Sequence, residues 1–176
     1  MKGMTDKTTK RLLGFYGFLR RIFNPFKFPT TELWKSKVNL PLGAFVNEVM
    51  KMAYKPDKLD GLLDWNDSLD TFWDEKKEHG RDCDDFSAAY IWWGINNGYD
   101  VTEYVVVSNE SKNLFKAISK TSHYVCVLHK DDDYILMNYY SYGLFKSEKE
   151  AIEYMSKFST YKHNLVYAKV REIQHL

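Results

Sequence analysis

Residues 83–97 are predicted to form a helix that is apolar on almost every side. The apolar and aromatic side chains of this segment are Phe86, Ala89, Tyr90, Trp92, Trp93 and Ile95. Gly98 follows, and glycine is well suited to the position just past a helix. A helix without a polar face has to be buried, often at the centre of a domain. The chain is therefore expected to fold around this helix.

Strands are expected to supply the surface on which the helix packs. Segments rich in β-branched or alternating apolar residues lie at 101–107, 122–129, 134–142 and 165–173. The polar residues 130–133 join two of these strands into an antiparallel hairpin. Further helices are expected at 10–23, 42–54 and 147–158, and a loop is expected at 30–41. Together these elements predict an α+β fold.

Composition is that of one folded domain rather than of a fibre or a membrane-spanning chain. The 176 residues are 44% hydrophobic, and the formal net charge of +1 gives no signal for nucleic-acid binding. Two cysteines do not make a disulfide framework, which favours a reduced, cytoplasmic setting. No apolar run reaches the roughly 18 residues that a bilayer span needs, and no signal-peptide cleavage pattern follows the N-terminal apolar stretch.

The first thirty residues are set apart from the rest by their charge. They carry seven Lys and Arg residues and one acid, so residues 1–30 are read as a basic N-terminal arm and residues 31–176 as the domain. The helix predicted at 10–23 is amphipathic, although Gly14 and Gly17 weaken it. Two interpretations stay open. The helix lies on an anionic membrane or a partner, or it packs on the domain with its basic side in solvent.

Cys83 is expected at or near the start of the central helix. Unpaired backbone N–H groups and the positive end of the helix dipole point at such a position. These surroundings lower the pKa of a thiol toward neutrality. The flanking residues Asp82, Asp84 and Asp85 fit N-cap and first-turn positions, but their negative charge opposes a thiolate. A nucleophile and an incidental cysteine are therefore both open on this segment alone.

His123 is the histidine best placed to serve a nucleophilic Cys83. It begins a predicted strand, and strand alternation puts it on the same face as the inward Val125 and Val127. His129 shares that face but lies about 20 Å away at the hairpin tip. Cys126 has the opposite parity and is expected to face away as a plain buried cysteine. The remaining histidines lie in a loop or toward the C-terminus: His79, His163 and His175.

Asn138 is the predicted group that orients the imidazole. If the hairpin turn is centred on Lys130 and Asp131, Asn138 lies directly opposite His123. Cβ atoms of such a pair are about 5 Å apart, so the amide oxygen can accept a hydrogen bond from the ring. A register error of two would keep Asn138 on this face, and an error of one would not. The alternative is that Asn138 is a polar residue of an edge strand without a catalytic role.

Three segments resemble the transglutaminase-like cysteine peptidases of bacterial and phage type, over roughly residues 60–145. Residues 80–88, Gly-Arg-Asp-Cys-Asp-Asp-Phe-Ser-Ala, are similar to the family's Gly-Asp-Cys-(Asp/Glu)-Asp-Phe-Ala segment, with Arg81 inserted. Residues 122–127, Ser-His-Tyr-Val-Cys-Val, resemble its His-Ala-(Trp/Tyr)-Val strand. Trp73 is similar to the tryptophan that precedes the cysteine segment. Asn138 stands where most members have aspartate.

The resemblance implies a papain-like core in which a central helix, with the cysteine at its N-terminus, packs on an antiparallel sheet. It implies acyl transfer from an amide by a catalytic triad of Cys83, His123 and Asn138. Asp85 would anchor the helix start, and Trp73 would be a candidate second oxyanion donor beside the Cys83 backbone N–H. The expected substrate is a protein or peptide. No metal and no cofactor are called for.

Alternatives to a thiol-dependent peptidase or amidase also fit the sequence. Water as acceptor would give hydrolysis, whereas an amine would give crosslinking. The inserted Arg81 and the departure at Asn138 favour instead a catalytically inactive domain that keeps the fold as a binding module. A third hypothesis is a protein that acts by docking to a membrane or partner through residues 1–30.

Overall fold

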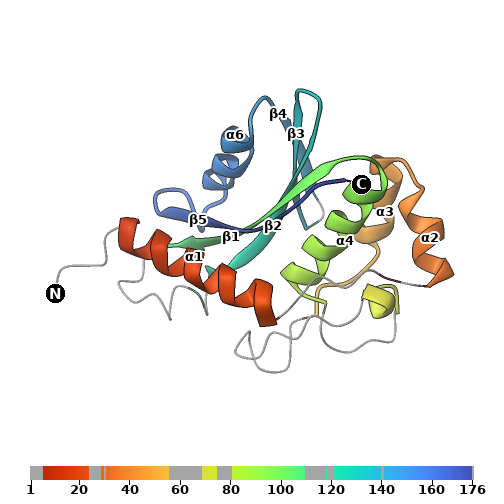
Figure 1. Ribbon diagram of the computed structural model, residues 1–176, viewed down its shortest axis with the longest axis horizontal. Coiled ribbons are helices and arrows are strands. Elements are labelled where there is room, and N and C mark those ends of the chain that lie inside the picture. The colour runs from red at the N-terminus through yellow and green to blue at the C-terminus, as the bar shows by residue number, and fades with distance from the viewer. Residues whose placement is uncertain are drawn as a thin grey trace.

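A five-stranded antiparallel sheet forms the middle of the molecule (Figure 1). The computed structural model describes residues 6–23, 29, 31–55, 69–74, 81–109, 118, 121–139 and 141–175. The sheet order is β4-β3-β2-β1-β5. The bounds of the strands are β1 Asp100–Ser108, β2 His123–Lys130, β3 Asp133–Asn138, β4 Ser141–Phe145 and β5 Leu165–Ile173. The α+β class predicted from the sequence is confirmed.

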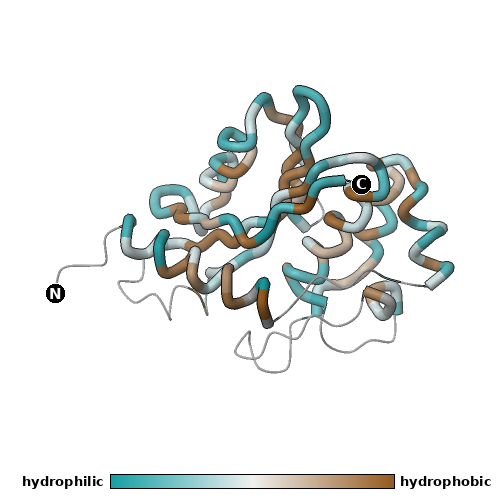
Figure 2. Tube along the Cα trace, viewed as in Figure 1, coloured by the Kyte–Doolittle hydropathy of each residue, from teal (hydrophilic) through white to brown (hydrophobic). Residues whose placement is uncertain are grey.

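Helices cover both faces of the sheet. Helices α1 (Asp6–Phe23) and α4 (Cys83–Asn96) lie against one face, and α6 (Glu148–Glu153) lies against the other (Figure 1). Strand β1 is consequently buried at every position from Val101 to Ser108. Figure 2 shows hydrophobic residues along these central strands and hydrophilic residues at the hairpin tips.

Helix α4 is the central element that the sequence predicted. The sheet covers one side of it, and helices α2 (Glu32–Val38) and α3 (Leu42–Met50) lie toward the other. Phe45 of α3 stacks on Trp93 at 6.0 Å and meets the edge of Tyr90 at 6.0 Å. Gly98, with φ at 75°, ends the helix in the left-handed conformation that glycine adopts without cost. Burial on both sides explains why α4 lacks a polar face.

A buried ion pair ties α4 to the sheet. Glu103 of β1 and Arg171 of β5 are cross-strand partners, with Arg171 Nε 2.6 Å from Glu103 Oε2. Ser87 of α4 donates a hydrogen bond of 3.2 Å to the second carboxylate oxygen of Glu103. All three side chains are buried. Because a buried charge is costly without its partner, this contact fixes the helix over one position of the sheet.

Helix α1 packs along β5 through small and apolar side chains. Leu13 is fully buried in a cluster that includes Val105 and Val166. A Cβ at Gly17 would lie 3.4 Å from the carbonyl oxygen of Lys169, so the two backbones approach closely here. Thr9 adds a hydrogen bond of 3.2 Å to Asn109 Oδ1. Within the described part of the chain, no helix is both long enough and apolar enough to cross a bilayer.

Two parts of the predicted secondary structure are wrong. Residues 30–41 contain helix α2, whose Trp34 and Val38 lie four residues apart and are both buried in the core. The single strand predicted at 134–142 is two strands, β3 and β4, separated by a turn at Tyr139 with φ at 44°. Tyr139 itself holds the left-handed conformation, so the sequence has no glycine or proline there that would indicate the turn.

Two α-helices also end earlier than predicted. The helix expected at 42–54 ends at Met50, and the one expected at 147–158 continues after Glu153 as a short 3-10 helix, Tyr154–Lys157. Its predicted start is confirmed, since the Ser147 hydroxyl accepts a hydrogen bond from the Glu150 N–H at 3.1 Å.

Candidate functional site

Cys83 is the first residue of α4 and is partly exposed. Asp82 is the N-cap, and its side chain accepts a hydrogen bond of 3.3 Å from the Asp84 N–H. Asp85 Oδ2 in turn accepts from the Asp82 N–H at 3.3 Å, which completes a capping box. The thiol is thereby held at a well-defined helix start, next to carboxylates that oppose its ionisation.

Ligand oxygens of Asp82, Asp84 and Asp85 lie within 4.8 Å of one another, a spacing that could suit a metal ion. The capping box accounts for this clustering, because Asp82 and Asp85 each accept a backbone N–H of the helix start. The three carboxylates are therefore read as part of the helix cap.

Arg81, the residue inserted relative to the family's cysteine segment, anchors the chain that leads into α4. Its side chain is buried and donates to the carbonyl oxygens of Asp74, at 2.5 Å, and of Ala53, at 3.4 Å. Its backbone pairs with Lys55 through hydrogen bonds of 2.8 and 2.9 Å. Arg81 thus connects the chain just before Cys83 to two other segments, at residues 53–55 and at Asp74. The sequence gives no sign of this role, because Arg81 lies in a polar stretch and arginine side chains are usually exposed.

His123 and Asn138 form a buried hydrogen bond, with His123 Nε2 2.6 Å from Asn138 Oδ1. Since the amide oxygen can only accept, Nε2 carries the proton and Nδ1 is the nitrogen with a lone pair. Burial lowers the pKa of His123 to about 4, and the hydrogen bond to Asn138 acts weakly in the opposite direction. The imidazole is therefore neutral at pH 7 and can accept a proton at Nδ1.

The register of the β2–β3 hairpin differs by two residues from the prediction. Cys126 pairs with Met137 and Lys130 with Asp133, so the turn consists of Asp131 and Asp132. Asp131, with φ at 54°, takes the left-handed conformation of the turn. A shift of two keeps Asn138 on the face of His123 but makes it a diagonal neighbour. Long side chains bridge such diagonals, which explains the hydrogen bond.

The predicted orientation of β2 toward the Cys83 helix is wrong for the middle of the strand. Cys126, expected to face away, packs with residues of α4, as does Leu128 of the same parity. Val125 and Val127 pack with residues of α6 on the opposite face. The prediction was wrong because helices cover both faces of the sheet. Side chains on either face of β2 are therefore buried. His123 has the parity of Val125, and its cross-strand partner Val106 also packs on the α6 face.

Tyr139 joins the His123 region to α4. Its ring lies 4.3 Å from the His123 ring and meets the edges of Phe86, at 5.7 Å, and Tyr54, at 5.6 Å. The Tyr90 hydroxyl donates to the Tyr139 carbonyl oxygen. Tyr139 thus contacts both the imidazole of His123 and Phe86 in the first turn of α4. Sequence reasoning missed it, because a strand was predicted to run straight through this position.

Cys83 packs against a buried cluster that contains Tyr124, the second residue of β2, and Val107 of β1. Burial first, and then negative charge on Cys83, raise the pKa of Tyr54 to about 12 and raise the pKa values of Tyr139 and Tyr161 as well. Tyr161 belongs to the α6 face and donates a hydrogen bond of 2.9 Å to the Thr121 carbonyl oxygen. The packing of Cys83 beside Tyr124 places it near the end of the sheet where β2 begins.

Trp73 lies in the core, among aromatic rings. Its ring contacts Trp34 at 5.3 Å, Phe72 at 4.9 Å and Phe45 at 6.1 Å. Its Nε1 is buried and has no hydrogen-bond partner in the described part of the chain. These contacts lead toward α2 and α3, whereas His123 and Asn138 contact Tyr139 and one another.

The other histidines are occupied elsewhere or lie outside the described residues. His129 stacks on Tyr134 at 4.3 Å near the hairpin tip. His175 Nδ1 lies 2.8 Å from Asp100 Oδ1, and His163 is exposed. His79 lies outside the described residues.

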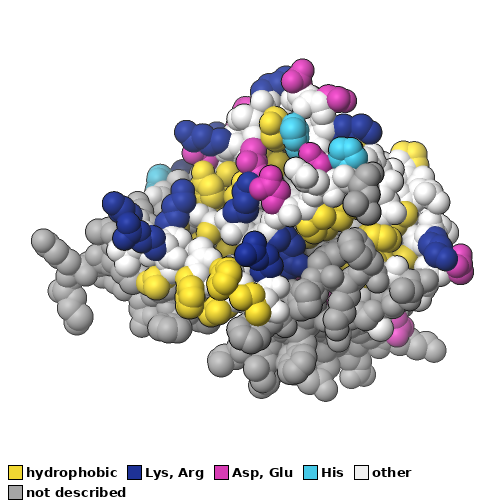
Figure 3. Space-filling model, in the orientation of Figure 1, with side chains coloured by type: hydrophobic (Ala, Val, Ile, Leu, Met, Phe, Trp, Pro, Cys, Tyr) yellow, Lys and Arg dark blue, Asp and Glu magenta, His cyan; other side chains and the backbone are white. Residues whose placement is uncertain are grey.

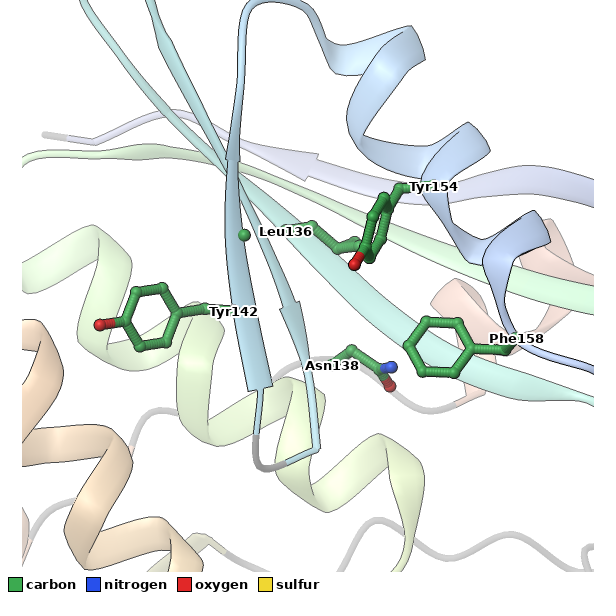
Figure 4. A pocket seen from close by; sticks show the side chains of 6 residues that line it. Leu136, Asn138, Tyr142, Tyr154 and Phe158 are labelled. Atoms are coloured by element: carbon green, nitrogen blue, oxygen red, sulfur yellow. The ribbon is translucent and has the colours of Figure 1, made fainter.

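A pocket of ≈ 280 Å³ opens beside Asn138 (Figure 4). The Asn138 carboxamide points toward the ring of Phe158, and Tyr154 lies on the same side of β3. Tyr142 points away on the other side of the strands. The pocket wall is therefore largely aromatic and apolar, with one amide that is already bound to a histidine.

Comparisons of the chain with protein-family models, with curated proteins and with solved structures gave no match.

Proposed function

We propose that the protein is a thiol-dependent acyl-transfer enzyme acting on amide bonds, a cysteine peptidase or amidase with a transglutaminase-like, papain-like core. The observation that carries the proposal is the buried hydrogen bond between His123 Nε2 and Asn138 Oδ1. It leaves a neutral imidazole with its acceptor nitrogen available for chemistry. A partly exposed cysteine at a helix start, near the same end of the sheet, supports the assignment.

The reaction follows from these three side chains. The Cys83 Sγ–H gives its proton to His123 Nδ1 as Sγ attacks the amide carbonyl carbon, forming a C–S bond. The imidazolium then protonates the leaving nitrogen as the C–N bond breaks, which leaves a thioester and neutral His123. Water or an amine attacks the thioester with His123 again as the base, and the thiol is regenerated. Asn138 keeps the ring in the required tautomer throughout.

Charge on the carbonyl oxygen during attack needs hydrogen-bond donors. The Cys83 backbone N–H, at the first position of α4, is the first candidate. One such donor is worth roughly 3 kcal/mol in other acyl-transfer enzymes. Trp73 Nε1 is a second candidate through the family resemblance alone, since the described contacts of Trp73 lie in the core.

A protein or peptide is the proposed substrate. The largely apolar pocket beside Asn138 would hold an apolar side chain next to the reacting amide. Hydrolysis and amine transfer use the same thioester, so the acceptor that reaches it decides between them.

The test compares the parent protein with Cys83→Ala, His123→Gln and Cys126→Ala in a library of peptides and glutamine amides, with and without an added amine. Cys83→Ala and His123→Gln should each lower turnover by at least about a thousandfold, as loss of a nucleophile or base does elsewhere. Cys126→Ala should keep turnover, because it removes the buried thiol only. Asn138→Asp should also keep it, since a carboxylate accepts the same proton.

Turnover that survives Cys83→Ala would contradict the proposal. So would a library without turnover combined with iodoacetamide labelling of Cys83 that is no faster than that of an exposed model thiol at pH 7. The second result would favour the catalytically inactive binding module.

A further inference from the structure

Helix α1 has a second apolar face that nothing in the described part of the chain covers. Leu12, Phe15, Phe18 and Ile22 expose 41%, 58%, 45% and 53% of their surface. Their spacing of three, three and four residues puts them on one stripe of the helix. The opposite stripe, with Leu13 and Gly17, is buried against the sheet. Isolated exposed apolar residues are ordinary, but a continuous stripe of them is typical of an interaction surface.

Basic side chains border this stripe on one flank. At 100° per residue, the basic residues run around the helix from the outer stripe toward the sheet in the order Arg11, Lys7, Arg21 and Lys10. All four are exposed, and the Arg21 guanidinium lies 5.5 Å from the centre of the Phe18 ring. None of the side chains described on α1, which are those of residues 7–19, 21 and 22, is acidic. Figure 3 shows hydrophobic side chains gathered over α1 with basic side chains beside them.

We propose that the outer face of α1 docks onto an anionic lipid bilayer. An apolar stripe bordered by cations matches the layered chemistry of a membrane surface, with acyl chains below and phosphate groups above. The long stems of Lys and Arg let their charges reach the headgroups while the aromatic rings enter the acyl boundary. The helix lies in the membrane plane and does not cross the bilayer, in agreement with its length and charge.

The docked helix would also set the position of the candidate site. Tyr16 on α1 and Cys83 on α4 pack against the same cluster of buried residues, which contains Leu13 and Tyr124. Docking through α1 would therefore hold the start of α4 near the membrane surface. The docking itself does not depend on the proposed catalysis.

The test is flotation of the full chain with phosphatidylcholine vesicles, with and without phosphatidylglycerol. The parent should float with the anionic vesicles and much less with the neutral ones. The double variant Phe15→Ser/Phe18→Ser should weaken binding at least about tenfold, because it removes apolar anchors of the stripe. Lys7→Glu/Arg11→Glu should weaken binding to the anionic vesicles alone. Tyr142→Ser/Leu144→Ser is the matched control, since it removes exposed apolar side chains from β4 and should leave binding unchanged.

Circular dichroism checks that each variant folds, and all altered residues are exposed in the structure. Equal flotation of the parent with both kinds of vesicle, or none with either, would overturn the proposal. So would flotation that Phe15→Ser/Phe18→Ser leaves intact. A dimer in gel filtration that this variant dissolves would show instead that a second copy of the chain covers the stripe.

Discussion

Cys83 and Cys126 lie on the same side of the sheet, yet their surroundings differ in every respect that controls thiol chemistry. Cys83 begins a helix and is partly exposed. Cys126 is in the middle of β2 and is completely buried among residues of α4. Burial, with a smaller contribution from the Glu103 carboxylate, raises the pKa of Cys126 well above its usual value. One chain thus contains a partly exposed thiol at a helix start and a thiol that is part of the core.

The position of a cysteine in the fold determines its exposure and its access to backbone N–H groups. Neither residue has a distinctive neighbour in the sequence that would make it reactive by itself. A helix start gives Cys83 access and backbone donors, whereas a strand between two covered faces gives Cys126 neither. Three experiments test how far these two environments differ in solution.

Labelling by iodoacetamide at pH 7 should show the largest contrast between the two thiols. Cys126 can react only when the core opens, which costs at least about 5 kcal/mol in a stable domain. Cys83 should therefore label faster by a factor on the order of several thousand, as measured by mass spectrometry of the two peptides. In 6 M guanidinium (roughly the concentration that unfolds most domains) the rates should become equal. A native ratio near one would show that the two environments do not differ in solution.

Breaking the buried ion pair should destabilise the core around Cys126. Glu103→Ala removes one member of a buried ion pair with Arg171, and such a change costs about 3–5 kcal/mol of the free energy of unfolding. Urea denaturation measures the loss. Labelling of Cys126 should accelerate accordingly, roughly a thousandfold, while that of Cys83 changes little.

Two variants control this prediction. Glu172→Ala removes an exposed carboxylate from the same strand as Arg171 and should cost less than about 0.5 kcal/mol. The double variant Glu103→Met/Arg171→Leu replaces the whole pair by apolar groups and should recover most of the loss. Failure of the double variant to recover would point to Ser87 and the remaining network as the main contribution.

Lowering the pH should lower the free energy of unfolding, because His123 is buried. The pKa of His123 is lowered to about 4 in the folded state, below the value of about 6.5 in the unfolded chain. Between these values the unfolded state binds the extra proton, so stability falls as the pH drops from about 6.5 to 4. The loss is on the order of 3 kcal/mol and ends below pH 4, where both states are protonated.

The contribution of His123 is obtained by comparing variants, because other ionisable groups also change protonation as the pH falls. One is Asp100, whose pKa is lowered by its hydrogen bonds to His175. His123→Gln should flatten the pH dependence of the unfolding free energy relative to the parent. His129→Gln, at the exposed hairpin, should not. Equal slopes for all three proteins would show that His123 is not buried as a neutral ring.

Strongly patterned parts of the fold were predictable from the sequence. Strand β5 has the predicted bounds, and α4 agrees within one residue, because each has an unbroken pattern that tertiary contacts only reinforce. Strand alternation predicted that His123 and Asn138 share one face. A register error of two residues does not change that face. These results depend on local geometry alone.

The rest depends on contacts between distant segments, which a sequence pattern does not record. The side chain of Arg81 is explained by the carbonyl groups of Ala53 and Asp74. Tyr139 adopts a left-handed turn that its residue type disfavours, and the rings around it account for its position. Cys126 was assigned to the wrong side because nothing in the strand shows that a helix covers each face.

Because His123 and Asn138 are diagonal neighbours, the number of residues in the distant hairpin turn determines whether their side chains can meet. The turn at Asp131 and Asp132 fixes how the two strands are matched along their whole length. Substitutions at that exposed tip leave the matching intact, but inserting or deleting a single residue there would rotate Asn138 to the opposite face if the mismatch travelled along the hairpin. Natural variation in this loop is thus expected in the kind of residue, and not in their number.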